Sequence, residues 1–218
     1  TRLSGWGSIL KRTFDIVGSA FFITLFSPFY LITALTIFIQ DGRPVIYKNK
    51  RVGKDGCEFD ALKFRSMKKE YCTGEQFGKQ GDKALKTEQE LIIKQSVKQG
   101  PVYKIKDDPR VTKFGQFIRR WSIDELPQFF NVLRGEMSLV GPRPHQPREV
   151  AEYERHHKIV LAIKPGITGL AQISGRSNLV FEEEVKLDSV YIENWNLLLD
   201  LIILAKTPYV VILKKGAW

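Results

Sequence analysis

The feature that most constrains the fold of this chain is an apolar segment near its N-terminus. The 25 residues from Ile16 to Gln40, IVGSAFFITLFSPFYLITALTIFIQ, contain no charged side chain, and about 20 apolar residues suffice for a helix to cross a bilayer. Pro28, near the middle, predicts a kink because it removes a backbone hydrogen bond, and the Ser27 hydroxyl can bind a carbonyl that the kink releases. The alternative is a buried core helix.

Basic residues on both sides of this segment indicate how it would lie in a membrane. Because Lys and Arg are retained on the cytoplasmic face, both ends of the segment are expected there. Each arm beside Pro28 is about 12 residues, or roughly 18 Å of helix, which is short of the roughly 30 Å hydrocarbon core. We therefore predict a re-entrant helical hairpin, with a kinked single span as the second possibility. The flanking basic residues are Arg2, Lys11, Arg12, Arg43, Lys48, Lys50, Arg51 and Lys54.

The charge of the chain favours an anionic partner. Its 218 residues include 34 Lys and Arg against 24 Asp and Glu, a net charge of +10. Such a chain attracts nucleic acid, an acidic membrane surface or phosphorylated substrates. The basic residues are dispersed and the apolar segment is long, which argues against a nucleic-acid binder. Cys57 and Cys72 lack a metal-binding spacing, so a reducing compartment is expected.

Two short runs after the apolar segment predict a β-hairpin. PVIYKNKRVG (44–53) and EFDALKFRSM (58–67) have the character of strands, and the KDG between them is a turn signal. Lys63 and Arg65 alternate with Phe64, so the two cations are predicted to share one face. That face is either a solvated strand surface or a site that binds phosphate.

The remaining segments are mostly helical in pattern. Residues 68–106 are polar and rich in lysine, with one helix expected over 83–99 and no catalytic residue. Two amphipathic helices are predicted within 113–133, and the C-terminal run 194–215 is apolar but interrupted by charge and proline. We expect these helices to lie in the plane of a membrane interface rather than on a soluble core. Their apolar residues include Phe114, Phe117, Ile118, Trp121, Leu126, Phe129, Phe130 and Leu133.

Two adjacent acidic residues, Asp124 and Glu125, stand in the stretch SIDELPQFF. One interpretation is helix capping, either as a capping box of Ser122 with Glu125 or with Asp124 as the N-cap and Pro127 in the first turn. The other is an active site, because neighbouring carboxylates commonly hold Mg²⁺ against phosphate. Residue chemistry alone leaves both interpretations open.

Two turns rich in glycine and proline supply cations that suit phosphate. GPRP (141–144) holds Arg143 on a stiff backbone, and KPGITGLAQISGR (164–176) ends at Arg176. A guanidinium can bind a phosphate through two hydrogen bonds, and backbone amides of a glycine-rich loop can add to them. The histidines, interpreted as surface residues without ligand-like neighbours, are His145, His156 and His157.

Several of these motifs occur together and in order in a known family. DELPQFFNVLRGEMSLVGPRP, preceded by KRTFD, the Ser-Pro break and KFRSM, and followed by PGITGLAQISGR, resembles the bacterial sugar transferases, the monotopic phosphoglycosyl transferases. The resemblance runs from about Ile9 to the C-terminus. It implies transfer of a sugar-1-phosphate from a UDP-sugar to polyprenol (undecaprenyl) phosphate, with Mg²⁺ and a covalent enzyme intermediate. It also implies the cytoplasmic face of the bacterial inner membrane.

The resemblance also implies roles for individual residues. Asp124 is the nucleophile and Glu125 its partner, and both carboxylates are the expected Mg²⁺ ligands. Ser27 and Pro28 correspond to the break in the membrane helix. The expected phosphate-binding residues are Lys63, Arg65, Arg143 and Arg176, with Asp188 in support, and the anchoring motif of the hairpin is Lys11, Arg12 and Asp15.

The predicted fold is therefore α+β and membrane-associated. Residues 1–42 form the re-entrant helix with basic flanks, and residues 43–218 form a catalytic domain on the cytoplasmic face. The long polar stretch resembles the branch that transfers galactose or glucose, at the start of O-antigen, capsule or exopolysaccharide synthesis. Some members of the family carry further N-terminal transmembrane segments and an extra domain. Expected partners are a UDP-sugar, polyprenol phosphate and an anionic bilayer, with a homo-oligomer also possible; a non-catalytic scaffold that binds anionic lipid is the alternative.

Overall fold

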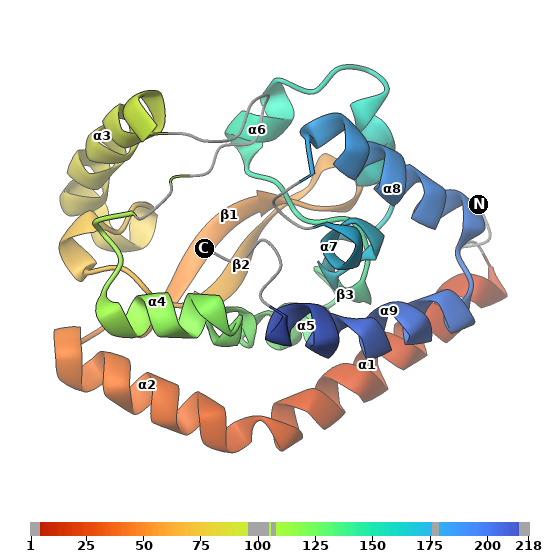
Figure 1. The fold of residues 1–218 in the computed structure, drawn as a ribbon, viewed down its shortest axis with the longest axis horizontal. Coiled ribbons are helices and arrows are strands. Elements are labelled where there is room, and N and C mark those ends of the chain that lie inside the picture. Colours follow the sequence, from red (N-terminus) through yellow and green to blue (C-terminus); the bar gives the residue numbers. More distant parts are fainter. Residues whose placement is uncertain (1–4, 96–104, 106–107, 176–178, 214–218) are drawn as a thin grey trace.

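The computed structural model describes residues 5–95, 105, 108–175 and 179–213, which form an α+β fold (Figure 1). Helices α1 and α2 form the lower edge of the view in Figure 1, and the β-hairpin, α3, α6 and α8 lie above them. The helices are α1 (Trp6–Leu25), α2 (Ser27–Asp41), α3 (Gly78–Gln95), α4 (Lys113–Arg120), α5 (Gln128–Arg134), α6 (Pro147–Ala151), α7 (Leu170–Ser174), α8 (Phe181–Asn194) and α9 (Leu197–Ile212). The strands are β1 (Ile46–Val52), β2 (Glu58–Phe64), β3 (Ser138–Val140) and β4 (Gly166–Thr168).

The predicted kink in the apolar segment is confirmed. The chain bends by 61° between α1 and α2, and Pro28 lies in the first turn of α2. In the part of the chain that the structure describes, no single helix is long and apolar enough to cross a bilayer, whereas the bent pair qualifies by length and composition. Many large apolar side chains of both helices face outward: Val17 on α1 is 64% exposed, and Leu31 on α2 is 71% exposed. The alternative of a buried core helix is therefore wrong.

The predicted hairpin is confirmed. β1 and β2 pair antiparallel, with Tyr47 opposite Lys63, and a 3-10 turn over Lys54–Gly56 joins them. A second sheet, in which β3 pairs parallel with β4, was not predicted. Each of these strands has three residues, too few to show a period in the sequence.

Helix α1 is tied to the rest of the fold by the KRTFD motif. The Lys11 amine donates to Asp200 at 2.7 Å and to the Val140 carbonyl at 3.0 Å. The Asp15 carboxylate accepts from the Leu139 amide at 2.9 Å. The Arg12 guanidinium donates to two carbonyls at the end of α5, those of Val132 at 2.6 Å and Leu133 at 2.7 Å. Charged residues at the start of the apolar segment thus connect it to α5, β3 and α9.

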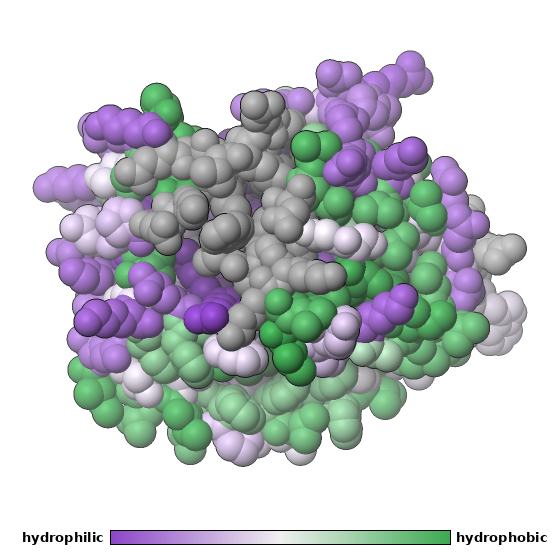
Figure 2. Space-filling model, in the orientation of Figure 1, coloured by the Kyte–Doolittle hydropathy of each residue, from purple (hydrophilic) through white to green (hydrophobic). Residues whose placement is uncertain are grey.

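The amphipathic helices form, but their apolar faces divide between core and solvent. Ile118 on α4 is fully buried, whereas Phe117 is 51% exposed. On and after these helices Trp121 and Phe130 are exposed, as are Leu198 and Tyr209 on α9. Figure 2 shows apolar residues gathered over the lower part of the molecule, where α1 and α2 lie. Phe22 of α1 stacks on Phe129 of α5 with ring centroids 5.2 Å apart, which joins this layer to the main core.

Helix α3 differs from its prediction in extent and in role. It begins at Gly78, five residues before the expected start, and its predicted end falls outside the described residues. Its Glu88 is buried and binds two guanidiniums, those of Arg110 at 3.1 Å and of Arg148 on α6. Arg110 also pairs with Asp108 at 2.8 Å. The polar stretch is therefore packed onto the globule through a buried ionic cluster.

Candidate active site

Asp124 and Glu125 lie in a 3-10 turn, Ile123–Glu125, between α4 and α5. The predicted capping box is wrong, because Ser122 has a left-handed backbone (φ 56°) and its side chain makes no capping hydrogen bond. The N-cap of α5 is Pro127, so the second capping interpretation is also wrong. A serine in the left-handed region is strained by about 1 kcal/mol, and such strain persists where the surrounding structure enforces it, often at functional sites.

Asp124 is buried, with 7% of its surface exposed. Burial raises the pKa of its carboxyl from 3.8 to about 6, and the charge of Glu125 adds to the rise, while Lys63 and Arg119 oppose it. Among the described residues, no side chain donates a hydrogen bond to Asp124. Its own backbone amide donates one, and this hydrogen bond favours the ionised carboxylate. A buried carboxylate with so few partners is costly to ionise and gains from any cation that arrives.

Glu125 is fixed by Lys63. The Lys63 amine lies 2.6 Å from a Glu125 carboxylate oxygen, and the side chains are 19% and 32% exposed. Lys63 stands near the end of β2, which packs against the turn. The structure thus places Lys63, a predicted phosphate-binding residue, beside the acidic pair.

Arg119 was not among the predicted site residues, although it lies near enough to lower the pKa of Asp124. It stands in the last turn of α4, and its Nε donates to the Ser66 hydroxyl at 2.8 Å. In the sequence Arg119 is a basic residue between two apolar positions, Ile118 and Trp121. A spacing of five residues does not by itself predict that Arg119 lies close to Asp124. Their proximity depends on the left-handed backbone of Ser122, which sets the direction of the chain between them.

The acidic pair has a donor set that suits Mg²⁺. Magnesium binds carboxylate oxygens and usually keeps further positions for phosphate or water. Asp124 is buried with its charge only partly compensated, and one Glu125 oxygen binds Lys63. A divalent cation here would reduce the repulsion between the two carboxylates, so the residues fit the ion.

The backbone of the GPRP turn, which carries Arg143, is hydrogen-bonded to β1. The Arg51 guanidinium donates to the Pro144 carbonyl at 3.0 Å, and the Val52 amide donates to the His145 carbonyl at 2.9 Å. Arg143 is exposed and has no hydrogen bond or ion pair to any described side chain. Its guanidinium is therefore available to a ligand while its backbone is held.

The structure does not bring Arg65 into this site. Its side chain is buried, and it donates to the carbonyls of Asp41 at 3.0 Å and Gly42 at 2.9 Å, at the end of α2. Its guanidinium also lies 3.3 Å from the Asp41 carboxylate. Lys63 and Arg65 thus serve different neighbours, and the predicted shared cationic face does not form. Arg176 lies outside the described residues.

Asp188 is buried on α8, one turn after Glu184. Burial and the neighbouring Glu184 raise the pKa of Asp188 well above its usual range, and a backbone hydrogen bond from Ala171 on α7 opposes the rise. One carboxyl oxygen has no partner in the described chain. Asp188 therefore supports the start of α7, in the glycine-rich segment that leads to Arg176.

The histidines were predicted to be surface residues, and for two of them this is wrong. His145 and His157 are buried, because their rings pack on Phe181. His157, His156 and Glu182 bring ligand atoms within 4.8 Å of one another, which a metal ion could use. However, His157 Nδ1 accepts from the Glu154 amide at 3.0 Å, so its Nε2 carries the proton that it donates to Glu182 at 2.7 Å. A protonated nitrogen has no free lone pair with which to bind a metal ion. The three side chains therefore form a hydrogen-bonded cluster rather than a metal site.

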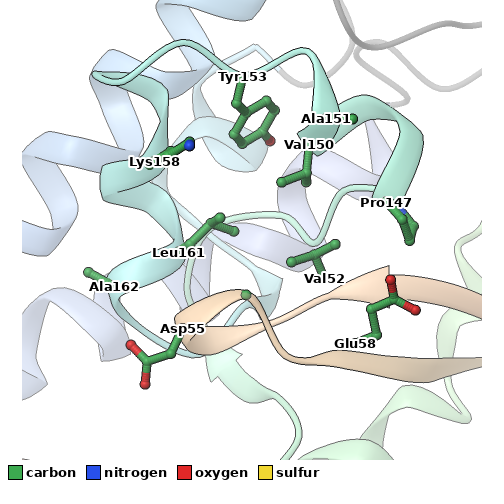
Figure 3. Close-up of a pocket in the computed structure, with 11 residues that line it drawn as sticks. Val52, Asp55, Glu58, Pro147, Val150, Ala151, Tyr153, Lys158, Leu161 and Ala162 are labelled. Atoms are coloured by element: carbon green, nitrogen blue, oxygen red, sulfur yellow. The ribbon is translucent and has the colours of Figure 1, made fainter.

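A hollow of about 620 Å³ lies elsewhere in the described chain. It is lined by the end of β1, the hairpin turn, α6 and the segment 158–162 (Figure 3). Val52, Tyr153 and Lys158 are among its lining residues, and none of the predicted site residues is. The Asp124 site is therefore defined by its charged groups and its strained turn.

Comparisons with known proteins identify a family for this chain. The family model described as bacterial sugar transferase matches residues 6–214. The chain is 42% identical to the undecaprenyl-phosphate galactose phosphotransferase of Salmonella typhimurium, over 96% of this chain and 42% of that protein. It is 37% identical to the UDP-glucose:undecaprenyl-phosphate glucose-1-phosphate transferase of Escherichia coli, over 100% of this chain and 43% of that protein.

A further relative has nearly the same length. The exopolysaccharide production protein ExoY of Rhizobium meliloti is 37% identical over 97% of this chain and 89% of that protein. Against several other relatives, including the first two above, the chain spans less than half their length. The match of nearly the whole chain to the family model, and the identity to a relative of similar length, show that this chain belongs to the bacterial sugar transferase family.

Proposed function

We propose that this chain transfers a sugar-1-phosphate from a UDP-sugar to polyprenyl phosphate through a covalent intermediate on Asp124. The observation that carries the proposal is the state of that residue. Its carboxylate is buried, its charge is only partly compensated, and it stands on a strained turn beside the Lys63–Glu125 pair. Aspartate carboxylates serve as nucleophiles in enzymes that form aspartyl phosphates, and a buried carboxylate with an incompletely compensated charge suits this role.

In the first step an Asp124 oxygen attacks the phosphorus that bears the sugar. A bond forms between that oxygen and phosphorus, and the bond from phosphorus to the bridging oxygen breaks, so UMP leaves with the bridging oxygen. Lys63 holds Glu125 and helps to keep Asp124 ionised by its positive charge. Arg143 is exposed on a turn that is hydrogen-bonded to β1, and its planar guanidinium binds the diphosphate oxygens through two hydrogen bonds.

In the second step an oxygen of the lipid phosphate attacks the same phosphorus. The bond to Asp124 breaks, the carboxylate is restored, and the product is a polyprenyl diphosphate sugar. Asp124 and Glu125 would hold Mg²⁺, which offsets the negative charge that accumulates on the phosphate oxygens. Because the first step needs only the soluble donor, UMP departs before the lipid phosphate must enter.

The exposed apolar faces support a location on a membrane. The bent pair α1 and α2, together with exposed aromatic residues near α4 and α5, offers an apolar surface next to the turn that holds Asp124. A re-entrant α1–α2 pair with both basic flanks on the cytoplasmic face would place the nucleophile close to the lipid phosphates. We propose the cytoplasmic face of the bacterial inner membrane.

The sugar is proposed from the relatives. Those at 42% and 37% identity are named for galactose and glucose transfer. We therefore propose UDP-galactose or UDP-glucose as the donor and the initiation of a surface polysaccharide as the context.

Covalent labelling tests the proposal. The protein in detergent is mixed with UDP-[¹⁴C]galactose or UDP-[¹⁴C]glucose and Mg²⁺, without lipid acceptor, and quenched rapidly. We expect stoichiometric UMP release and label on the peptide that contains Asp124. Added polyprenyl phosphate should then remove the label.

The Glu125→Gln variant is the matched comparison, because it retains the nucleophile but changes its neighbour. It should form the labelled peptide more slowly than wild type. If UMP appears only when both substrates are present and no peptide is labelled, transfer is direct in a ternary complex. If no UMP appears with any donor, the chain is a scaffold rather than a transferase.

A further inference from the structure

A second hollow, of about 430 Å³, lies between the β-hairpin, the end of α5 and the segment before β4. Its polar lining is mainly charged and includes five cations and three acids. The cations are Lys48, Lys50, Lys54, Arg134 and Lys164, and the acids are Glu58, Asp60 and Glu136. Proposed catalysis uses none of these residues.

This hollow is separate from the Asp124 site. The residues of β2 that line the hollow are Glu58, Phe59, Asp60 and Leu62, and Lys63 is not among them. Arg134 lies at the end of α5, and the start of α5 follows the Asp124 turn, so the two sites are separated by about 10 Å of helix.

The acids of the hollow are partly engaged. Asp60 pairs with Lys50 at 3.2 Å, and Glu136 accepts from the Asn131 side chain at 2.7 Å. In contrast, the side chains of Lys48, Arg134 and Lys164 have no ion-pair or hydrogen-bond partner among the described residues. The hollow therefore has an excess of unpaired positive charge.

Lys164 is partly buried as well as unpaired. The pKa of its amine is lowered, first by burial and then by the charges of Arg12 and Lys54, while the charge of Asp15 opposes the fall. The Lys164 Nζ and the Arg12 Nη2 lie 3.4 and 3.5 Å from the position that a Cβ on Gly135 would occupy. Two cations thus approach one point beside Gly135, where an anion would be stabilised by both.

We propose that this hollow binds a phosphate group, with Lys164 and Arg134 as its main ligands and Lys48 at its rim. A phosphate accepts several charge-assisted hydrogen bonds and would compensate the partly buried Lys164 amine. The group belongs either to an anionic lipid or to a soluble phosphate compound. Arg12, which neighbours Lys164, stands on α1, so a lipid headgroup could reach the hollow from the apolar face.

Binding measurements on charge-matched variants test the proposal. Lys164→Gln and Arg134→Gln each remove one positive charge from the hollow. Lys158→Gln removes one from an exposed position that lines the other hollow, so it controls for net charge. Inorganic pyrophosphate is titrated by calorimetry into the protein in neutral detergent, and vesicles of phosphatidylcholine with and without phosphatidylglycerol are tested by co-sedimentation.

With pyrophosphate or with phosphatidylglycerol vesicles, Lys164→Gln and Arg134→Gln should weaken binding about tenfold or more, because each removes a charged hydrogen-bond donor. Lys158→Gln should match wild type. Lys63→Gln alters the Asp124 site and the diphosphate binding proposed there. It should leave vesicle binding and the response of the Lys164 amine in place, so failure of the proposed catalysis would not affect these results. An effect with vesicles alone identifies a lipid headgroup, and an effect with pyrophosphate alone identifies a soluble ligand.

Equal weakening in Lys164→Gln, Arg134→Gln and Lys158→Gln would mean that net charge alone attracts the anions, and it would overturn the proposal. Absence of binding by wild type to both probes would do the same. Arg134 is exposed, so its variant will fold even if Lys164→Gln does not. As a site-specific readout, the pKa of Lys164, followed by NMR of labelled lysine, should rise when the effective probe is added.

Discussion

Two buried aspartates in this molecule have opposite surroundings. Asp200, fully buried at the start of α9, accepts hydrogen bonds from Lys11 at 2.7 Å, Tyr191 at 2.7 Å and Trp195 at 3.2 Å. Asp124 is almost as buried, yet among the described residues the only hydrogen bond it receives is from its own backbone amide. Lys63 and Arg119 stabilise its charge only through longer-range electrostatic attraction. The first carboxylate is satisfied by the fold, and the second is left for a ligand.

The difference indicates which buried charge is structural. A buried carboxylate with a cation and several donors joins elements together, and here Asp200 joins α9 to α1 and α8. A buried carboxylate without such partners reduces stability, and a protein retains it when it acts on a substrate. The same Asp→Asn substitution should therefore have different effects at the two positions.

The largest effect is expected for turnover in Asp124→Asn. The amide keeps the size of the side chain but cannot act as the oxygen nucleophile, and it is a poorer Mg²⁺ ligand. We expect UMP release to fall by at least about a thousandfold, since loss of a nucleophile removes several kcal/mol of barrier lowering. UMP release is measured by coupled assay with donor, polyprenyl phosphate and Mg²⁺, and turnover within tenfold of wild type would exclude Asp124 as the nucleophile.

Asp200→Asn should instead lower stability. It removes the charge that compensates the buried Lys11 amine, and breaking a buried ion pair costs about 3 kcal/mol. Lys11 keeps a weaker contact with Asp15, at 3.8 Å, so the loss should fall at the lower end of such effects. Thermal unfolding in detergent checks the prediction, and the specific activity of the folded fraction should remain close to wild type. A variant that unfolds normally but is inactive would assign Asp200 to the active site.

The sequence predicted those parts of the molecule that have a regular period or a strong local signal. The kink follows from Pro28, and the hairpin follows from two alternating runs around a turn. It did not predict the backbone of Ser122, because φ at this residue is set by packing of α4 and the Asp124 turn rather than by its own preference. The sequence pattern S-x-x-E therefore suggested a capping box that does not form.

Ion pairs between residues far apart in the chain could also not be predicted from the sequence. Lys63 and Arg65 alternate in the same run, yet one binds Glu125 across 62 positions of chain and the other binds the end of α2. The acidic pair itself and Arg143 were identified from local motifs. Their surroundings, including Arg119 and the fastening of the GPRP turn by Arg51, depend on contacts between elements.

The pH dependence of stability should also separate the two aspartates. The pKa of Asp124 is raised to about 6 in the folded state, so the folded protein binds this proton more tightly than the unfolded chain does. Its contribution to stability is present below pH 3.8 and is lost as pH rises through about 6. Relative to Asp124→Asn, wild type should therefore lose about 2–3 kcal/mol of stability over this window.

This loss is measured as the difference in free energy of unfolding between wild type and Asp124→Asn from pH 4 to pH 7.5. Above about pH 6 the asparagine variant should be the more stable of the two, while Asp200→Asn should be less stable than wild type. A difference that does not change with pH would mean that Asp124 titrates normally and is not held in a poorly compensated site.

The smallest effect concerns the cations of the same two regions. Arg12 donates to the Val132 and Leu133 carbonyls, whereas Arg143 has no partner among the described residues. Arg→Lys keeps the charge and removes the planar fork at each position. Arg143→Lys should lower kcat/KM for the UDP-sugar about tenfold, the effect of one charge-assisted hydrogen bond, with unchanged stability. Arg12→Lys should leave kcat/KM of the folded enzyme unchanged and cost about 1 kcal/mol of stability. Steady-state kinetics and thermal unfolding of both variants check this, and equal kcat/KM for Arg143→Lys and wild type would mean that Arg143 does not bind phosphate through its fork.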